Sequence, residues 1–293
     1  MGRNEKLNRA KSAKNDEFYT RYEDIEAECE NYDFSGMTVY CNCDDYEKSN
    51  FFKYFHDNFE KLKLKKLITS AINGNACFYD GKEMQTFALK DGSFDSEETQ
   101  PLLEEADIVV TNPPFSNIID FWGLLKRYNK KFLYIVPQVF LANWRGAKGI
   151  KDDEYWIGYT NPQRFDTPEG LKSVNTYFLT NMNTGEYPKV KDEEPPIFAD
   201  IANYKGSYID VPEKVLFLKS MKDFPEDYED YIAVPVGFFT KYRRTAKKEE
   251  KKENWINYYH THDIFGMIRP VIDGKEKFTR YLVKRKPKKT EEK

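Results

Sequence analysis

The stretch that decides the fold reads Ala106-Asp107-Ile108-Val109-Val110-Thr111-Asn112-Pro113-Pro114-Phe115. Its first half is a short apolar run that ends at a turn, a pattern typical of a buried strand. Open α/β folds bind their ligands beyond the carboxyl ends of the strands. We therefore predict that residues 112–115 form a binding loop at the carboxyl edge of a sheet.

This loop has the chemistry needed to hold a planar molecule that carries an exocyclic amine. Pro113 and Pro114 stiffen the backbone and remove two N–H donors, so the loop mainly presents carbonyl oxygens. Asn112 adds a side-chain carbonyl and an NH₂ group, and Phe115 adds a flat apolar face for stacking. A plain turn after a strand uses similar residues, so the surrounding sequence has to decide between the two interpretations.

Strands alternate with helices around this stretch. We expect helices over residues 15–30, 49–59, 102–106 and 117–128, and strands over residues 37–43, 67–72, 107–111, 131–136, 155–159 and 174–179. Residues 76–79 and 84–88 flank an Asp-Gly turn and predict a hairpin. The alternation predicts an α/β fold with a mostly parallel sheet and helices on both faces.

The residue pattern of the chain changes after about residue 183, where a long loop rich in Pro and charged residues begins. Short apolar segments follow, and residues 266–283 read as a hairpin that turns at Asp273-Gly274. We predict a mobile N-terminus over residues 1–14, a main domain over residues 15–183 and a smaller α+β region over residues 184–293.

Composition is that of an ordinary globular protein. The chain has 293 residues, of which 40% are hydrophobic, and a formal net charge of −3. It has no run of roughly 20 apolar residues and no segment of signal-peptide type at its start, so we expect a cytoplasmic protein with reduced cysteines. Cys41 and Cys43 form a C-x-C, which is not the usual spacing of a structural zinc site, and we expect no metal.

Basic residues gather in the C-terminal part of this mildly acidic chain. Such a cluster is either a basic face, of the kind that contacts nucleic-acid phosphates, or a set of ordinary solvated charges. Its members, which are the candidates for phosphate contacts, are Lys241, Arg243, Arg244, Lys247 and Lys248. The basic run over residues 284–289 is interpreted as a solvated tail.

Three further segments carry candidate binding groups, and each has a simpler interpretation. The strand end at residues 41–45 lacks a glycine-rich turn, but its carboxylates can bind an amino group or ribose hydroxyls, or cap the next helix. Asp91-Gly92-Ser93-Phe94 suits the edge and face of an adenine ring, or forms a turn. Phe18-Tyr19-Thr20 can close a site over the sheet, or pack as part of a helix.

Together these segments resemble the EcoRI-type adenine-specific DNA methyltransferase family. The resemblance is carried by residues 14–20, by residues 40–45 followed by Ser49-Asn50-Phe51-Phe52-Lys53-Tyr54-Phe55, by residues 91–94 and by residues 106–116. It is specific over about residues 14–120. The resemblance implies a class I methyltransferase fold of Rossmann-like type, S-adenosylmethionine as methyl donor, and N6 of adenine in double-stranded DNA as acceptor.

The resemblance also implies roles for individual residues. Asn112, Pro113, Pro114 and Phe115 would form the catalytic loop. The cofactor-binding residues would be Phe18, Tyr19, Thr20, Cys41, Asn42, Asp44, Asp91 and Phe94. Residues 137–145 and 240–262 depart from the family's pattern. The resemblance therefore implies the chemistry but not the DNA sequence that the chain recognises. We expect a monomer that acts on DNA, with residues 184–293 contacting it.

Two other functions are compatible with these residues. One is a methyltransferase for another planar amine, either an RNA base or a protein glutamine, because similar loops serve those substrates. The other is a catalytically silent DNA-binding protein on a methyltransferase fold, which the missing glycine-rich turn favours.

Overall fold

The computed structural model describes residues 19–141, 144–151, 154–168, 170–182, 215–219, 228–238, 262–272, 275–276 and 278–285. The chain divides into two compact units, one made of residues 1–140 and 155–184 and the other of residues 141–154 and 185–293. No helix among the described residues is long and apolar enough to cross a membrane.

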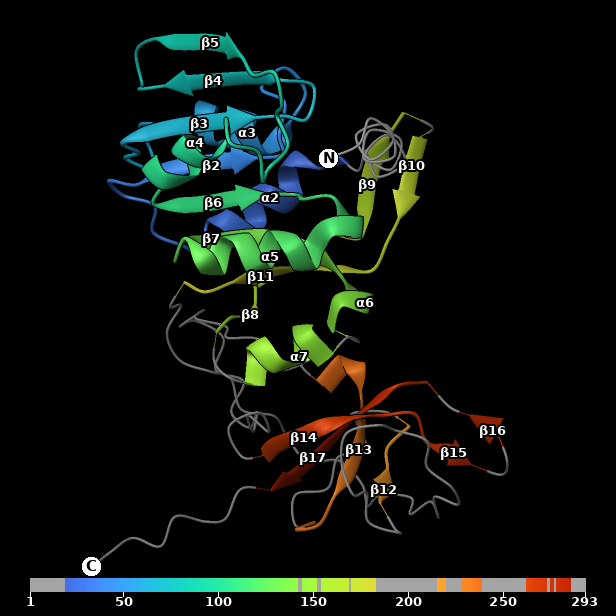
Figure 1. Cartoon of the computed structure of the whole chain (residues 1–293). Helices are drawn as coiled ribbons and strands as arrows, with labels where there is room; N and C mark the ends of the chain where they lie inside the picture. The colour runs from blue at the N-terminus through green and yellow to red at the C-terminus, as the bar shows by residue number, and fades with distance from the viewer. Residues whose placement is uncertain are drawn as a thin grey trace, which may run out of the picture. The chain divides into compact units, whose positions relative to one another are not determined.

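The first unit is built on an eight-stranded sheet in the order β5-β4-β3-β2-β6-β7-β11-β8 (Figure 1). Its four central strands are parallel: β3 (Lys66–Ser70), β2 (Thr38–Asn42), β6 (Ile108–Thr111) and β7 (Lys131–Pro137). The strands on either side pair in antiparallel fashion: β4 (Asn75–Tyr79), β5 (Met84–Ala88), β11 (Thr176–Thr180) and β8 (Trp156–Ile157).

The predicted α/β class is confirmed, and the sheet is mixed. The connections between the central strands contain helices, as parallel pairing requires, whereas β3, β4 and β5 follow one another through short turns, which force antiparallel pairing. β11 pairs with β7 in antiparallel fashion although a long segment of the chain separates them. The predicted hairpin joins β4 to β5, with Tyr79 opposite Met84. Its connection includes Gly81 at φ +92°, a conformation that glycine adopts without strain.

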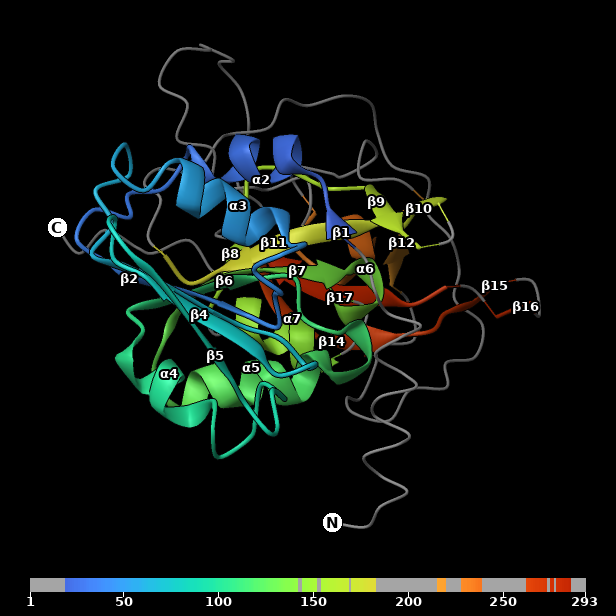
Figure 2. The same ribbon diagram turned by 90° about the horizontal axis from the view of Figure 1, so that it is seen from above.

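Helices cover both faces of this sheet, as Figure 2 shows. On one face lie α2 (Tyr22–Cys29) and α3 (Asn50–Asp57), and on the other α4 (Gln100–Glu105) and α5 (Ile118–Arg127). Alternate residues of the buried strands point to the two faces, so each face has its own core. Val39, Cys41, Ile108 and Val110 pack with the first pair of helices.

The helix α3 begins where the sequence predicts. Ser49 is its N-cap, and the Ser49 hydroxyl accepts hydrogen bonds from the N–H groups of Phe51 at 3.0 Å and Phe52 at 3.4 Å. Phe51, Phe52 and Phe55 form the expected apolar stripe and are buried against the sheet. A single hydroxyl therefore fixes the start of the helix that follows the first central strand.

A three-stranded sheet in the order β1-β9-β10 was not predicted. It consists of β1 (Tyr19–Thr20), β9 (Arg164–Thr167) and β10 (Gly170–Ser173), with all pairs antiparallel. The expected helix over residues 15–30 is therefore wrong at residues 19–20, which form a strand opposite Phe165 and Asp166. These strands are too short, and β10 too exposed, to produce a period of two in the sequence.

A buried carboxylate, Glu28, joins α2 to the loop that follows β8. Tyr32 donates its hydroxyl to Glu28 at 2.6 Å, and Thr160 donates both its hydroxyl at 2.7 Å and its backbone N–H at 2.6 Å. The backbone N–H of Tyr159 adds a fourth bond at 2.9 Å. Burial nevertheless raises the pKa of Glu28 above its usual range.

The second unit contains a four-stranded sheet in the order β12-β13-β17-β14 and the strand pair β15-β16. These strands are β12 (Leu216–Phe217), β13 (Ile232–Pro235), β14 (His262–Ile268), β15 (Val271–Ile272), β16 (Lys275–Glu276) and β17 (Arg280–Arg285). The predicted C-terminal hairpin is confirmed, because β14 and β17 are antiparallel and Ile272 lies opposite Lys275.

The second unit also includes α7 (Trp144–Lys151), which comes from the middle of the chain. The short helix α6 (Gln138–Leu141) leads into it after β7. Within this unit the hydroxyl of Tyr281 on β17 donates to the backbone carbonyl of Leu141. The chain passes between the units three times, after residues 140, 154 and 184. The sequence carried no signal for the segment 141–154, and the domain boundary predicted at residues 183–184 stays a prediction.

Candidate active site

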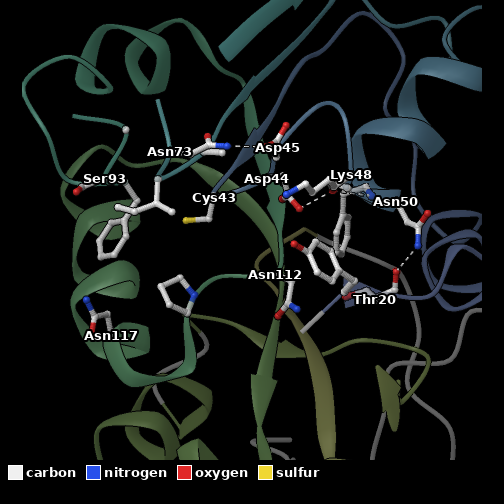
Figure 3. Close-up of a pocket in the computed structure, with 18 of the residues that line it drawn as sticks. Thr20, Cys43, Asp44, Asp45, Lys48, Asn50, Asn73, Ser93, Asn112 and Asn117 are labelled. Carbon is white, nitrogen blue, oxygen red and sulfur yellow. Dashed lines mark hydrogen bonds between the residues drawn. The ribbon is translucent and has the colours of Figure 1, made fainter. Parts of the chain in front are cut away.

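A pocket of about 200 Å³ lies at the carboxyl ends of β2, β3 and β6 (Figure 3). Its lining residues come from five segments, within residues 19–20, 43–51, 71–73, 92–95 and 112–117. The parallel arrangement of the three strands is what brings the loops after them to one edge of the sheet. This is the edge at which the sequence predicts a ligand.

Six predicted site residues line this pocket, namely Tyr19, Thr20, Asp44, Phe94, Asn112 and Pro114. Five others do not: Cys41 and Asn42 are fully buried within β2, and Asp91, Pro113 and Phe115 lie beside the lining. Phe18 and the predicted DNA contacts Lys241, Arg243, Arg244, Lys247 and Lys248 lie outside the described residues.

Asp44 is the most buried ionisable residue of the pocket lining, with 8% of its surface exposed. The hydroxyl of Ser49 lies 2.6 Å from its Oδ1, and the hydroxyl of Thr111 lies 2.5 Å from its Oδ2. The backbone N–H of Asn112 is a further donor to this carboxyl group. Burial outweighs these hydrogen bonds and raises the pKa of Asp44 to about 7.

Asp45, the next residue, connects two segments at the edge of the pocket. Its carboxylate accepts hydrogen bonds from the side-chain amides of Asn73 at 2.7 Å and Asn75 at 3.2 Å. Asn73 lies in the connection between β3 and β4, and Asn75 is the first residue of β4, so the loop after β2 is tied to the segment after β3. Neither aspartate is the N-cap of α3, a role that Ser49 fills.

The loop at residues 91–94 is held in place by its own turn. The carboxylate of Asp91 accepts hydrogen bonds from the Ser93 N–H at 3.1 Å and the Ser93 hydroxyl at 2.6 Å. Gly92 packs directly on the backbone of Ala71, and an added Cβ would approach the carbonyl carbon of Ala71 to 2.9 Å. The absence of a side chain at Gly92 therefore lets Phe94 reach the pocket.

Cys43 occupies the position at which a glycine-rich turn is absent. Its φ is +82°, in the left-handed region that glycine favours, so the backbone makes a tight turn here without a glycine. Its thiol lines the pocket, and burial raises its pKa well above the usual range. The thiol therefore stays protonated at neutral pH, which does not suit a nucleophile.

The loop at residues 112–117 passes from β6 into a short 3₁₀ helix and then into α5. The N–H of Asn117 donates to the carbonyl of Pro114 at 3.0 Å, which closes the turn. The ring of Phe115 packs edge-on against Phe165 of β9, with the ring centres 6.5 Å apart. The unpredicted β1-β9-β10 sheet thus supports the loop from the side.

Several lining residues were missed by the sequence analysis. Lys48 is an exposed ammonium group just before α3, and Ile72 is an apolar side chain with 54% of its surface exposed after β3. A residue two or three positions beyond a central strand is a general candidate for the ligand edge, and that rule would have found Ile72 and Asn73. Asn50 holds β1 in place by donating to the carbonyl of Thr20 at 2.8 Å.

Metal-binding arrangements were sought among the same residues. In the part of the chain that the structure describes, no group of three or more His, Cys, Asp or Glu side chains is placed to hold a metal ion. His260 and His262 form an H-x-H segment, and His260 lies outside the described residues.

Comparison with known proteins gives consistent matches along the chain. The family described as Adenine-specific methyltransferase EcoRI matches residues 6–88 and 71–194. Type II methyltransferase M.MpnI of Mycoplasma pneumoniae is 33% identical over 315 residues, covering 96% of this chain and 98% of the relative. Type II methyltransferase M.MgeORF184P of Mycoplasma genitalium is 31% identical, covering 95% and 98%. No solved structure matches the chain.

A third relative comes from a different bacterium. Type II methyltransferase M.EcoRI of Escherichia coli is 32% identical over 286 residues, covering 82% of this chain and 86% of the relative. The resemblance found in the sequence is thereby confirmed, and DNA adenine methylation is favoured over the RNA, protein and silent alternatives. The chain belongs to the EcoRI family of adenine-specific methyltransferases, and it is a site-specific adenine DNA methyltransferase that requires a methyl donor.

Proposed function

We propose that this protein transfers a methyl group from S-adenosylmethionine to N6 of an adenine rotated out of double-stranded DNA. The observation that carries the proposal is the pocket at the ends of β2, β3 and β6. Residues expected to bind the donor and residues expected to bind the acceptor both line it. The parallel centre of the sheet, with helices on both faces, supports a class I methyltransferase fold of Rossmann-like type.

The lining of the pocket fits S-adenosylmethionine in chemical terms. The hydroxyl of Thr20 is buried and has no hydrogen-bond partner among the described residues, so it suits a polar group of a ligand. Ile72 and Phe94 offer apolar surface for an adenine ring. Lys48 and the N-terminus of α3 favour a carboxylate, because both supply positive potential.

The family resemblance assigns different parts of the donor to different residues of this pocket. Tyr19 and Thr20 would lie at the methionine end of the donor, Asp44 at its middle and Phe94 at its adenine end. Phe18, Cys41, Asn42 and Asp91 are proposed to act through the residues next to them. Bound S-adenosylmethionine would supply an electrophilic methyl group on its sulfonium sulfur.

The chain's own contribution to the chemistry is orientation. The target base has to leave the duplex, because its N6 is otherwise paired and stacked. The side-chain carbonyl of Asn112 and the backbone carbonyl of Pro113 would accept the two N6 hydrogens and direct the nitrogen lone pair toward the methyl carbon. The ring of Phe115, which is only partly buried, would stack on the extruded base. Transfer is then a direct displacement, and the amine loses one proton to solvent.

Residues 184–293 are proposed to contact DNA, with Lys241, Arg243, Arg244, Lys247 and Lys248 on phosphates. Replacing several of these cations by glutamine should weaken binding to every DNA sequence and flatten its dependence on salt. We further propose that the protein acts as a monomer in the cytoplasm. A variant with all five replaced whose affinity matches the parent at each salt concentration would refute the phosphate contacts.

The test of the proposed function combines binding, activity and target. Adding S-adenosylmethionine should raise the melting temperature, since a ligand that binds the native state stabilises it. Modification-sensitive sequencing of DNA from cells that express the chain should reveal N6-methyladenine in one sequence context. The proposal fails if the donor leaves the melting temperature unchanged and no adenine is modified.

The Asn112→Ala variant tests the catalytic loop. It should lower the rate of methyl transfer on the order of 100-fold or more, as expected when one preorganised polar group is removed, while donor binding persists. Asn31→Ala is the matched control, because Asn31 bonds only to carbonyls at the end of α2 and does not line the pocket. Methylation at the parental rate by Asn112→Ala would show that the loop acts differently.

A further inference from the structure

The carboxyl group of Asp44 lies where three parts of the pocket meet. It follows β2, it contacts the Ser49 hydroxyl that caps α3, and it contacts Thr111 and the N–H of Asn112 at the end of β6. The backbone carbonyl of Asp44 also accepts from the hydroxyl of Thr69 on β3. One residue therefore connects the donor side of the pocket to the first residue of the catalytic loop.

The protonation state of the Asp44 carboxyl group decides the direction of its hydrogen bond with Thr111, as a count of the available hydrogens shows. The hydroxyl of Thr111 has one hydrogen, yet it contacts two buried acceptors, the backbone carbonyl of Asn42 and Oδ2 of Asp44. When Asp44 is ionised, the hydroxyl can bond to only one of them. When Asp44 is protonated, it can donate to Thr111, which then donates to Asn42. The direction of the bond beside Asn112 thus depends on the protonation of Asp44.

The surroundings of Asp44 make both states accessible near neutral pH. Desolvation is the main influence on its pKa of about 7, and the neighbouring carboxylate of Asp45 acts in the same direction. The other titratable groups nearby are the thiols of Cys41 and Cys43, whose pKa values are raised well above their usual range. Lys48 is a further charged residue of the pocket lining, and the described parts of β3 and β6 bring no ionisable group to Asp44.

We propose that Asp44 is a positioning residue for methyl transfer: its ionised carboxylate holds the catalytic loop through Thr111 and the Asn112 N–H, and its protonation loosens that hold. The protonated state keeps the contact with Thr111 with the direction of the bond reversed, so the difference lies in the bond from the Asn112 N–H. Hydrogen bonds to a charged acceptor are shorter and stronger than those to a neutral one, and the ionised state therefore holds the Asn112 N–H more firmly. This inference rests on the proposed function, and it assigns Asp44 an action through neighbouring residues in place of direct contact with the donor.

The first test compares rates across pH from about 5.5 to 8.5, at saturating donor and DNA. The wild-type kcat should fall by about ten-fold or more as the pH drops through the pKa of Asp44, and it should level off above that pH. Asp44→Asn, which cannot ionise, should lower kcat at high pH by about ten-fold or more and remove the step, with donor Kd changed less than about three-fold.

Variants of Thr111 and Glu28 separate positioning from folding. Thr111→Val should lower kcat in the same way, and Thr111→Ser, which keeps the hydroxyl, should restore it. Glu28→Gln is the matched control, because it neutralises a second buried carboxylate that does not line the pocket. It should keep the wild-type pH profile.

A measurement on the ligand-free protein tests the same idea without catalysis. Amide hydrogen exchange of peptides that contain residues 110–117 should be slower at pH 8 in wild type than in Asp44→Asn, after correction for intrinsic exchange rates. Glu28→Gln should match wild type in these peptides.

The inference is overturned if Asp44→Asn keeps the pH step, if it weakens donor binding with kcat unchanged, or if protection of residues 110–117 is unaltered. It is overturned independently of Asp44→Asn if Thr111→Val has parental kcat. Failure of the proposed function is distinguishable, because it would appear in the wild type as a lack of donor binding and of DNA methylation.

Discussion

Glu28 and Asp44 are two buried carboxylic acids in the same α/β unit, and their surroundings are chemically alike. Each is held by hydroxyl groups and backbone N–H groups, and burial raises the pKa of each. They differ in what those donors belong to. The partners of Glu28 come from the turn after α2 and the loop after β8, whereas those of Asp44 come from the rim of the pocket.

The comparison teaches that a buried, perturbed carboxyl group does not by itself mark a functional site. Structural networks shift pKa values as catalytic sites do, so location has to be added to the argument. Asp44 contacts the loop that carries Asn112. The hydrogen-bond partners of Glu28 among the described residues are Tyr32, Tyr159 and Thr160, and none of them lines the pocket. The two residues should therefore be equal in stability experiments and unequal in functional ones.

Truncating either carboxylate should have the largest effect on stability. Glu28→Ala and Asp44→Ala each leave buried hydrogen-bond donors without an acceptor. Each should therefore lower the free energy of unfolding, measured by urea denaturation, on the order of 3 kcal/mol. Only Asp44→Ala should also reduce kcat of the folded fraction. Equal loss of kcat in both variants would erase the distinction between the two regions.

Stability should also depend on pH through these groups. The folded protein binds the proton of Asp44 more tightly than the unfolded chain does, with a pKa of about 7 against 3.8. This contribution is fully present below the unfolded pKa and is lost as pH rises through the folded pKa. The wild type should therefore lose on the order of a few kcal/mol between about pH 4 and pH 7.

Asp44→Asn and Glu28→Gln should each show a shallower decline in melting temperature over that range, because each lacks one of the two titrating groups. The pH at which the wild type is most stable is then lower than the pH at which it is most active. A decline in Asp44→Asn as steep as in wild type would show that Asp44 keeps an ordinary pKa.

Two glycines provide a smaller and more selective comparison. A Cβ at Gly158 would press on Oε1 of Glu28 and approach Cβ of Phe178 to 2.8 Å, and a Cβ at Gly92 would press on the backbone of Ala71. Gly158→Ala and Gly92→Ala should each destabilise by about 1–3 kcal/mol. Only Gly92→Ala should weaken donor binding, measured by calorimetry, since Gly92 lines the pocket.

Gly123 is the control for both glycine variants. It lies exposed within α5, and an added Cβ meets nothing within 4 Å. Gly123→Ala should stabilise by about 0.5–1 kcal/mol, because alanine loses less conformational freedom in a helix. Weaker donor binding in Gly158→Ala would mean that the Glu28 region extends to the pocket.

Cys43 should give the smallest effect. Its φ of +82° strains a non-glycine residue, and Cys43→Gly relieves that strain while adding freedom to the unfolded chain, so stability should stay within about 1 kcal/mol of wild type. Cys43→Gly should retain methylation, because no step uses the thiol. Loss of activity with donor binding intact would give the thiol a part in the chemistry.

Much of the α/β unit follows from periodicity alone. The apolar runs that become β2, β6 and β7 are buried on both faces of the sheet, and such strands are recognisable because nearly every residue is hydrophobic. The start of α3 was equally predictable from Ser49 and the phenylalanines that follow it. The strands β1, β9 and β10 were not predicted. The residues that pair β1 with β9 lie about 145 positions apart in the chain, and β9 and β10 are short, with β10 exposed throughout. No local pattern therefore specifies these strands.

The candidate site divides in the same way. The sequence by itself determined the loop at residues 112–115 and its place at a strand end, since two prolines and an apolar run act locally. Tertiary structure alone decided that Cys41 and Asn42 are buried, that Lys48 and Ile72 line the pocket, and that Asp44 bonds to Thr111. Those facts depend on which strands are neighbours and on how deeply each side chain is buried, and residues 67 positions apart in the chain meet only after the sheet has formed.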